Sequence, residues 1–328
     1  MDRIKLPPEP IRRRIEALNQ TPPVRARWTR ACRGLSEDTV WRLEGGSQTL
    51  AVRCWRINDY KLQLIRQLRR VLSWTCKEGL AFVAAPIGEP IHDGEGGLWE
   101  MAPWKSGSPL SELSEDSSAV EEAVKGLVQW HVVARRLSDP PSWFPRGMQL
   151  RRYRLKQLDT IAQEIPWLVD DRVAARWPEL TPLVRGRCQA AERAAQAIRS
   201  IDWSQATSQM IHGDARPEHF LIENGELTGL IDFGAMRRDT PWADLARLAG
   251  ELGPGRIEEV VSLYEQASGQ PVDRAAVAAL DLAGAAVSSA NWSRWLSDPS
   301  RHWPDPELVR QRLRSISSRL AAGGFGPA

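Results

Sequence analysis

Residues 211–234, IHGDARPEHFLIENGELTGLIDFG, decide how the chain is interpreted. A short apolar run at 220–222 precedes Asn224-Gly225, the strongest short-range signal for a two-residue hairpin turn. Because a hairpin folds the chain back, we expect Asp214 before it and Asp232 after it to lie near one another. Two neighbouring carboxylates are costly unless a cation lies between them, and Mg²⁺ with nucleotide phosphates is one such cation.

The order and spacing of these motifs resemble the catalytic core of the aminoglycoside phosphotransferase and choline kinase-like family, small-molecule relatives of protein kinases. Protein kinases carry HRD, then Asn five residues after the Asp, then DFG. Here His219 follows Asp214 by five positions, and Asp232 follows it by eighteen. The resemblance implies an α/β (α+β) protein of bilobal kinase-like fold, with a small mixed lobe and a larger helical lobe. The alternative is an ordinary hairpin that carries surface acids.

Roles for individual residues follow from the resemblance. It implies that Asp214 is the catalytic base or orients the acceptor hydroxyl, and that Asp232 binds Mg²⁺ at the phosphates of ATP. His219 stands at the second metal position, where its nitrogen suits Mg²⁺ less well than an amide oxygen, so Mn²⁺ is a possible alternative. His212 and Asp244 are expected to support the catalytic loop, although an Asp at position 244 could instead cap a helix.

The sequence of the amino-terminal part predicts a sheet, and the resemblance implies that this sheet covers ATP. Residues 40–43 and 49–55 look like two strands around a turn, and residues 82–87 look like another. The resemblance would make residues 34–39 the phosphate-covering loop. It puts Arg53 where many kinases have the lysine that grips the α- and β-phosphates, a task that a forked guanidinium can also perform.

A helix is predicted at 59–74 from its apolar spacing. In kinases the corresponding helix offers a Glu to the strand lysine, but no Glu lies between Arg56 and Cys76. Either an acid from elsewhere pairs with Arg53, or Arg53 pairs only with phosphate. Residues 98–104 resemble the strand that runs into the hinge, where backbone groups near Glu100 and Ala102 would bind adenine.

The remaining chain is predicted to be mainly helical, at 120–136, 151–165, 170–177, 183–201 and 257–320. In the family such an inserted helical region helps to build the acceptor pocket, and most of its mixed charges are expected to be solvated. We divide the chain into a basic, Pro-containing extension at 1–30, an N-lobe at 31–103, and a C-lobe at 104–328 that contains the catalytic hairpin.

Composition limits the other classes of function. The net charge of the 328 residues is +3, too small to argue for nucleic acid. No uncharged apolar run reaches the roughly eighteen residues that a membrane span requires. No signal peptide opens the chain, and its four cysteines form no CxxC pair, so we expect a reduced, cytoplasmic compartment.

These observations favour an ATP-dependent phosphotransferase that acts on a hydroxyl of a small molecule, of the aminoglycoside, choline or homoserine kinase-like type. The alternative is a pseudokinase that binds a nucleotide or metabolite without turnover, and Arg53, His219 and the missing helix Glu motivate it. A scaffold that uses the basic amino terminus is a third possibility. The presence of both Asp214 and Asp232 favours the enzyme, because a scaffold has no physical need for both.

Overall fold

The computed structural model describes residues 6–31, 39–57, 59–137, 147–164, 171–299, 301, 303 and 305–324. The backbone forms two compact units, Met1–Gly107 with Thr228–Ile231, and Ser108–Leu227 with Asp232–Ala328. The predicted loop at 34–39 falls outside the described residues except for Thr39. No helix in the described part of the chain is long and apolar enough to span a membrane.

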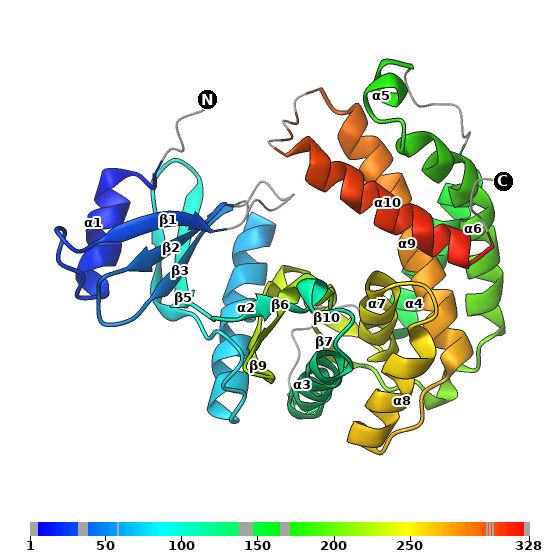
Figure 1. Ribbon diagram of the computed structural model, residues 1–328, viewed down its shortest axis with the longest axis horizontal. Helices are drawn as coiled ribbons and strands as arrows, with labels where there is room; N and C mark the ends of the chain where they lie inside the picture. The colour runs from blue at the N-terminus through cyan, green and yellow to red at the C-terminus, as the bar shows by residue number, and fades with distance from the viewer. Residues whose placement is uncertain are drawn as a thin grey trace. The chain divides into compact units, whose positions relative to one another are not determined.

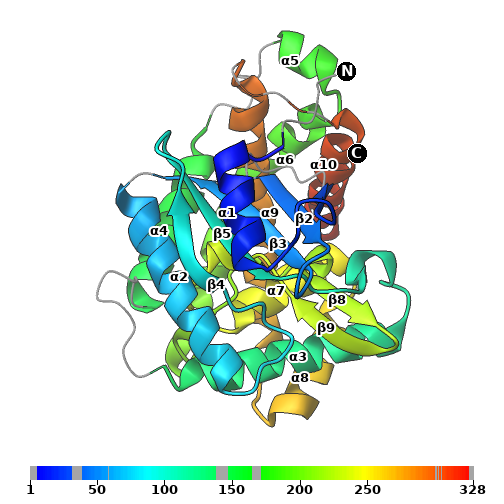
Figure 2. The same cartoon turned by 90° about the vertical axis from the view of Figure 1, so that its left-hand side faces the viewer.

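The first unit is built on a five-stranded antiparallel sheet (Figure 1). Its strands, in the order β1-β2-β3-β5-β4, are β1 (Arg27–Ala31), β2 (Thr39–Glu44), β3 (Leu50–Arg56), β5 (Gly97–Pro103) and β4 (Ile87–His92). Helix α1 (Glu9–Leu18) lies over the sheet (Figure 2), and its Ile11 and Ile15 join the core formed by β2, β3, β4 and β5. Helix α2 (Asp59–Lys77) follows β3.

The strands predicted at 40–43 and 49–55 and the helix predicted at 59–74 are confirmed, and β1 is an additional strand. The strand predicted at 82–87 is wrong, because β4 begins only at Ile87 and Val83 forms an isolated bridge. Leu80 and Val83 are buried within turns, where the N–H of Val83 donates to the carbonyl of Leu80. A run of apolar residues indicates that the segment is buried, but a buried segment need not be a strand.

The second unit is mainly helical. Its α-helices are α3 (Ser117–Arg135), α4 (Gly147–Ala162), α5 (Asp171–Arg176), α6 (Leu180–Ser200), α7 (Trp242–Leu252), α8 (Ile257–Ser268), α9 (Arg274–Ser297) and α10 (Pro306–Ala322). Asp273 caps α9 by accepting from the N–H groups of Ala275 and Ala276. The α9 helix is rich in alanine and packs against α4, α6, α7 and α10, so small side chains occupy the centre of this unit.

Short strands hold the motif region. Strand β7 (Gln209–Ile211) pairs with β10 (Arg237–Asp239), and β6 (Ser108–Pro109) pairs with β8 (Phe220–Glu223). The predicted hairpin is confirmed, since β8 and β9 (Glu226–Leu230) are neighbours around Asn224 and Gly225. Both turn residues have positive φ, 54° and 81°, as the favoured two-residue hairpin turn requires.

Candidate active site

A glycine shapes the loop that carries Asp214 directly after β7. Gly213 has φ +84°, and a Cβ added there would lie 2.1 Å from the carbonyl oxygen of Ala235. A side chain at this position would therefore meet both an unfavourable backbone conformation and a steric clash. The Nη1 of Arg237 donates to the carbonyl of Gly213 at 2.8 Å and holds the loop against β10.

Asp244 braces the same loop from α7. Its carboxylate accepts from the backbone N–H groups of His212 and Gly213, both at 2.8 Å, and from Nε2 of His131 at 3.0 Å. Although burial opposes ionisation, the bond from His131 and its other contacts keep the pKa of Asp244 below its usual range. The N-cap of α7 is Pro241, so Asp244 contacts the loop from within the helix.

Two histidines complete the support behind the loop. His131 is buried, and its Nδ1 accepts from the hydroxyl of Tyr264 at 2.9 Å. His212 is fully buried, with its ring 4.6 Å from the ring of Phe233 and its Nδ1 accepting from the N–H of Asp214 at 3.3 Å. The HGD and DFG motifs are thus packed together through His212 and Phe233.

Two arginines hold the Asp214 carboxylate. Nε of Arg247 lies 2.9 Å from its Oδ1, and Nε of Arg216 lies 3.1 Å from its Oδ2. Burial raises the pKa of Asp214, but the charges of Arg247 and Arg216 outweigh burial and hold it well below the usual range. Asp214 is therefore ionised at neutral pH and is a weak base. Arg216 also pairs with Glu218, at 2.7 Å.

His219 lies between the two aspartates of the motif. Its Nδ1 is 2.7 Å from the backbone carbonyl of Asp214, and its Nε2 is 3.7 Å from Oδ2 of Asp232. A carbonyl oxygen only accepts, so Nδ1 carries a proton, and the tautomer protonated at Nδ1 alone presents a lone pair at Nε2. Nη2 of Arg216 lies 3.4 Å from this nitrogen. The hairpin therefore brings Asp214 and Asp232 to opposite sides of one imidazole.

The Asp232 carboxylate and the His219 imidazole are suited to a cation that receives its other ligands from a bound molecule. Asp232 is in the left-handed region with φ 59°, and its side chain is 41% exposed. Nowhere in the described part of the chain do three or more His, Cys, Asp or Glu side chains gather into a self-sufficient metal cluster. One carboxylate and one imidazole leave most coordination positions open, as in sites where substrate phosphates complete the shell.

A buried charge network extends from Asp214 into the helices. Nη1 of Arg247 lies 2.9 Å from Glu251, which also pairs with Arg312 and Arg319 of α10. Nη2 of Arg319 lies 2.6 Å from Asp281 of α9. Burial raises the pKa of Glu251, but its three arginines hold it well below the usual range. Asp214 is therefore anchored through α7 to α9 and α10.

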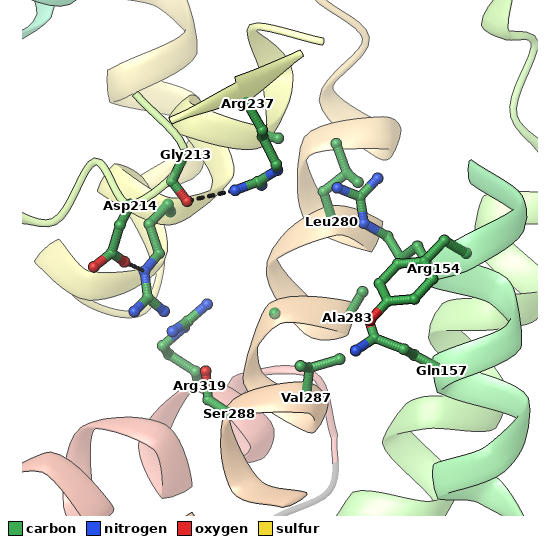
Figure 3. A pocket seen from close by; sticks show the side chains of 14 residues that line it. Arg154, Gln157, Gly213, Asp214, Arg237, Leu280, Ala283, Val287, Ser288 and Arg319 are labelled. Carbon is green, nitrogen blue, oxygen red and sulfur yellow. Dashed lines mark hydrogen bonds and ion pairs between the residues drawn. The ribbon is translucent and has the colours of Figure 1, made fainter. Parts of the chain in front are cut away.

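A cavity of about 360 Å³ opens beside Asp214 and lies wholly within the second unit (Figure 3). Arg154 and Gln157 reach it from α4, and α9 contributes small or apolar side chains. Its lining residues are Tyr153, Arg154, Gln157, Gly213, Asp214, Arg237, Ala243, Arg247, Leu280, Ala283, Gly284, Val287, Ser288 and Arg319. The sequence predicted an acceptor pocket in the helical part but did not identify its walls.

The candidate residues of the first unit are arranged differently from the kinase pattern. Arg53 and Glu100 are partners across β3 and β5, and the Arg53 guanidinium lies 3.7 Å from the centre of the Trp55 ring. The Glu100 carboxylate accepts from Nη1 of Arg69 at 2.8 Å and from Nε1 of Trp55 at 3.1 Å. Helix α2 thus supplies the cation and the strand supplies the acid. Ala102 pairs with Ala51 across the same two strands.

The charge network behind Asp214 could not be found from motifs. Arg247, Glu251, Arg319 and Asp281 belong to no motif; Arg247 and Glu251 pair within α7, and the contacts from Arg247 to Asp214, from Arg319 to Glu251 and from Arg319 to Asp281 join residues more than 30 positions apart. One signal was available, because Arg247 follows Asp244 by one helical turn and so lies on the same face of α7.

Comparison with known proteins places the chain in a family. The profile of the phosphotransferase enzyme family (APH) matches residues 27–280, so the chain belongs to this family. A search of the curated proteins gave no match.

Solved structures share the fold at low sequence identity. Spectinomycin phosphotransferase APH(9)-Ia, in complex with ADP and spectinomycin, is 11% identical, with a TM-score of 0.65 over 91% of this chain and 93% of that one. Aminoglycoside 2'-phosphotransferase-IIIa, as a GDP complex, is 15% identical, with a TM-score of 0.64 over 96% and 100%. A putative aminoglycoside phosphotransferase from Ralstonia eutropha JMP134 is 14% identical, with a TM-score of 0.59 over 97% and 99%.

The predicted family and the predicted kinase-like fold are therefore confirmed. An amino-terminal antiparallel sheet is followed by a mainly helical part, as in the aminoglycoside phosphotransferase structures.

Proposed function

We propose that the protein is an ATP-dependent phosphotransferase that transfers the γ-phosphoryl group to a hydroxyl of a small molecule. The observation that carries the proposal is the position of His219, whose Nδ1 contacts the backbone carbonyl of Asp214 and whose Nε2 lies 3.7 Å from Asp232, while Asp214 also lines the 360 Å³ cavity. Membership of the phosphotransferase family and the nucleotide complexes of structurally similar proteins support it.

In this proposal Asp214 receives the acceptor hydroxyl from the cavity. The hydroxyl oxygen bonds to the γ-phosphorus as the bond to the β-phosphate oxygen breaks, ADP leaves, and the hydroxyl proton passes to Asp214. The pKa of Asp214 is lowered, which makes it a weak base. Phosphoryl transfer tolerates this because its barrier is lowered mainly by positioning and charge stabilisation.

Asp232 and His219 fit the divalent cation that such chemistry uses. The carboxylate of Asp232 and the Nε2 lone pair of His219 would hold it, and phosphate oxygens would fill other positions. When bound, Mg²⁺ or Mn²⁺ neutralises phosphate charge. The bond from Nδ1 to the Asp214 carbonyl fixes the ring orientation, a common arrangement behind metal-binding imidazoles.

We also propose that Arg53 contacts phosphate and that backbone groups near Glu100 and Ala102 contact adenine.

Release of ADP from ATP, with Mg²⁺ or Mn²⁺ and a panel of hydroxyl compounds, tests the proposal. We expect Asp214→Asn to lower kcat by about 10² to 10⁴, the usual contribution of a positioned acid–base group, and to retain ATP binding. Asp159→Asn is the matched control, because Asp159 is an exposed aspartate on α4.

The alternative, a pseudokinase, predicts a different result from the same experiment. It is favoured by the two arginines that already occupy the Asp214 carboxylate. ATP binding without ADP release above background for any acceptor would support the pseudokinase and overturn the enzyme. Equal turnover by wild type and Asp214→Asn would remove Asp214 from the reaction.

A further inference from the structure

Arginines dominate the charged side chains that line the cavity beside Asp214. Four arginines line it, Arg154, Arg237, Arg247 and Arg319, and Asp214 is its one lining carboxylate among the described residues. They come from α4, β10, α7 and α10, so the charge is a property of the whole wall. Figure 3 shows Arg154 reaching the cavity from one side, and Arg237 and Arg319 lying on the other.

Two of the four lining arginines, Arg247 and Arg319, are neutralised by carboxylates of the buried charge network. Arg247, Arg312 and Arg319 face three carboxylates, Asp214, Glu251 and Asp281. A count of formal charges therefore gives zero for this group, and Arg247 and Arg319 have structural partners.

Arg154 and Arg237 are balanced less completely. Nη2 of Arg154 lies 2.6 Å from Oδ2 of Asp239, and Nε of Arg237 lies 3.3 Å from the same oxygen. Two guanidinium groups therefore share one carboxylate, which leaves one formal positive charge. The Asp239 side chain is only 5% exposed, compared with 17% for Arg154 and 32% for Arg237. Asp239 does not line the cavity, whereas both arginines do.

We propose that the phosphoryl acceptor is an anion: a small hydroxyl compound whose carboxylate or phosphate group binds Arg154 and Arg237. This inference rests on the proposed function, because it places the acceptor hydroxyl at Asp214. Guanidinium groups bind carboxylate and phosphate through forked, charge-assisted hydrogen bonds. Protonated amines, such as those of an aminoglycoside, meet the incompletely balanced Arg154 and Arg237 here, and like charges disfavour such a ligand.

The size and shape of the cavity suit a compact ligand. A volume of about 360 Å³ lies near the lower end of the roughly 300–1,000 Å³ that small-molecule sites have. The side chains of α9 that line it include Leu280, Ala283 and Val287, which form an apolar wall for a carbon skeleton. The remaining polar side chains of the wall, Tyr153, Gln157 and Ser288, can bind further hydroxyl groups.

The test compares probes of one size and different charge. Glucuronate, glucose 6-phosphate, glucose and glucosamine are titrated into the full chain at pH 6.5 and followed by calorimetry and ligand-observed NMR. We expect one or both anions to bind at least tenfold more tightly than glucose, and glucosamine to bind most weakly. The two anions distinguish a carboxylate site from a phosphate site.

Three variants localise the effect. Arg154→Gln keeps a donor for Asp239 but removes the charge, and we expect it to weaken anion binding about tenfold, the size of a lost charge-assisted hydrogen bond. Gln157→Glu adds a negative charge to the same wall without removing a buried partner, and it should act in the same direction. Arg152→Gln is the matched control, because Arg152 is an exposed arginine of α4 that does not line the cavity.

The inference is overturned if glucose or glucosamine binds as well as the anions, if neither anion binds at tens of millimolar, or if Arg152→Gln weakens binding as much as Arg154→Gln. Metal-dependent ATP binding, measured separately on the same protein, distinguishes this failure from failure of the proposed function. A protein that binds ATP and metal but no anion refutes only the acceptor class.

Discussion

Charged residues differ between the two units of the molecule in how deeply they are buried and in how many partners they have. In the second unit Asp214 is held by two arginines, and one of them is fixed in turn by Glu251, which is only 5% exposed and contacts three arginines. In the first unit the pair between Arg69 and Glu100 is 15% and 14% exposed, and Arg53 stacks on Trp55. The Asp214 carboxylate is therefore held by more than one partner within a buried network, while the Glu100 carboxylate pairs with one arginine of α2 and Arg53 lies against an aromatic ring.

This difference teaches where a kinase-like site can change. Removal of one partner from a buried charge network leaves buried charge that is less well compensated, so a single change there is costly. The pair between Arg69 of α2 and Glu100 of β5 is more accessible to water, so the loss of one partner should cost less there.

The largest effect is expected from breaking the network at its centre. Arg247→Met should lower the free energy of unfolding by about 3–5 kcal/mol, because it leaves Asp214 and Glu251 each without one buried partner. Arg69→Met should cost about 1 kcal/mol, closer to a partly exposed pair. Urea denaturation of both variants measures the difference, and equal losses would contradict the contrast between the two units.

The acid dependence of stability should come mainly from the second unit. The pKa values of Asp214 and Glu251 are lowered in the folded protein, so the unfolded chain binds more protons in acid. Their contribution is complete above the unfolded pKa of about 4 and is lost as the pH falls further. Asp281 acts in the opposite sense, because burial raises its pKa.

We therefore expect the free energy of unfolding to fall by roughly 2 kcal/mol between pH 5 and pH 3. Glu251→Gln should flatten this dependence, whereas Glu121→Gln, at an exposed site on α3, should leave it unchanged. Urea unfolding at several pH values gives the slope. A slope that Glu251→Gln leaves intact would show that the acid sensitivity arises elsewhere.

A smaller effect should follow from restoring the kinase residue at position 219. His219→Asn replaces a ring nitrogen with an amide oxygen, which suits Mg²⁺ better. We expect the preference for Mn²⁺ over Mg²⁺ in supporting ATP binding to fall by about tenfold, comparable to other changes near metal ligands. Titration of each metal at fixed ATP measures it, and an unchanged preference would argue that His219 does not contact the metal.

How much of the site the sequence reveals depends on the range of the contacts involved. The hairpin at Asn224-Gly225 and the positions of Asp214 and Asp232 are local consequences of turn chemistry and motif spacing, so the sequence predicted them. The strand predicted at 82–87 failed because burial in a turn resembles burial in a strand. Arg247 and Arg154 could not be assigned in advance, because their partners Asp214 and Asp239 lie 33 and 85 positions away.

The central claim is that Asp232 and His219 bind the metal that accompanies ATP. Calorimetric titration of the purified chain with ATP, without metal and with Mg²⁺ or Mn²⁺, tests it most directly when Asp232→Asn is measured beside wild type. Glu218→Gln is the matched control, because Glu218 is 40% exposed and Asp232 is 41% exposed, and both belong to the motif segment.

We predict metal-dependent ATP binding in wild type and Glu218→Gln that is lost in Asp232→Asn. Equal metal-dependent binding by all three proteins would place the metal elsewhere. Failure of the folded wild-type protein to bind ATP with either metal would contradict the phosphotransferase account itself.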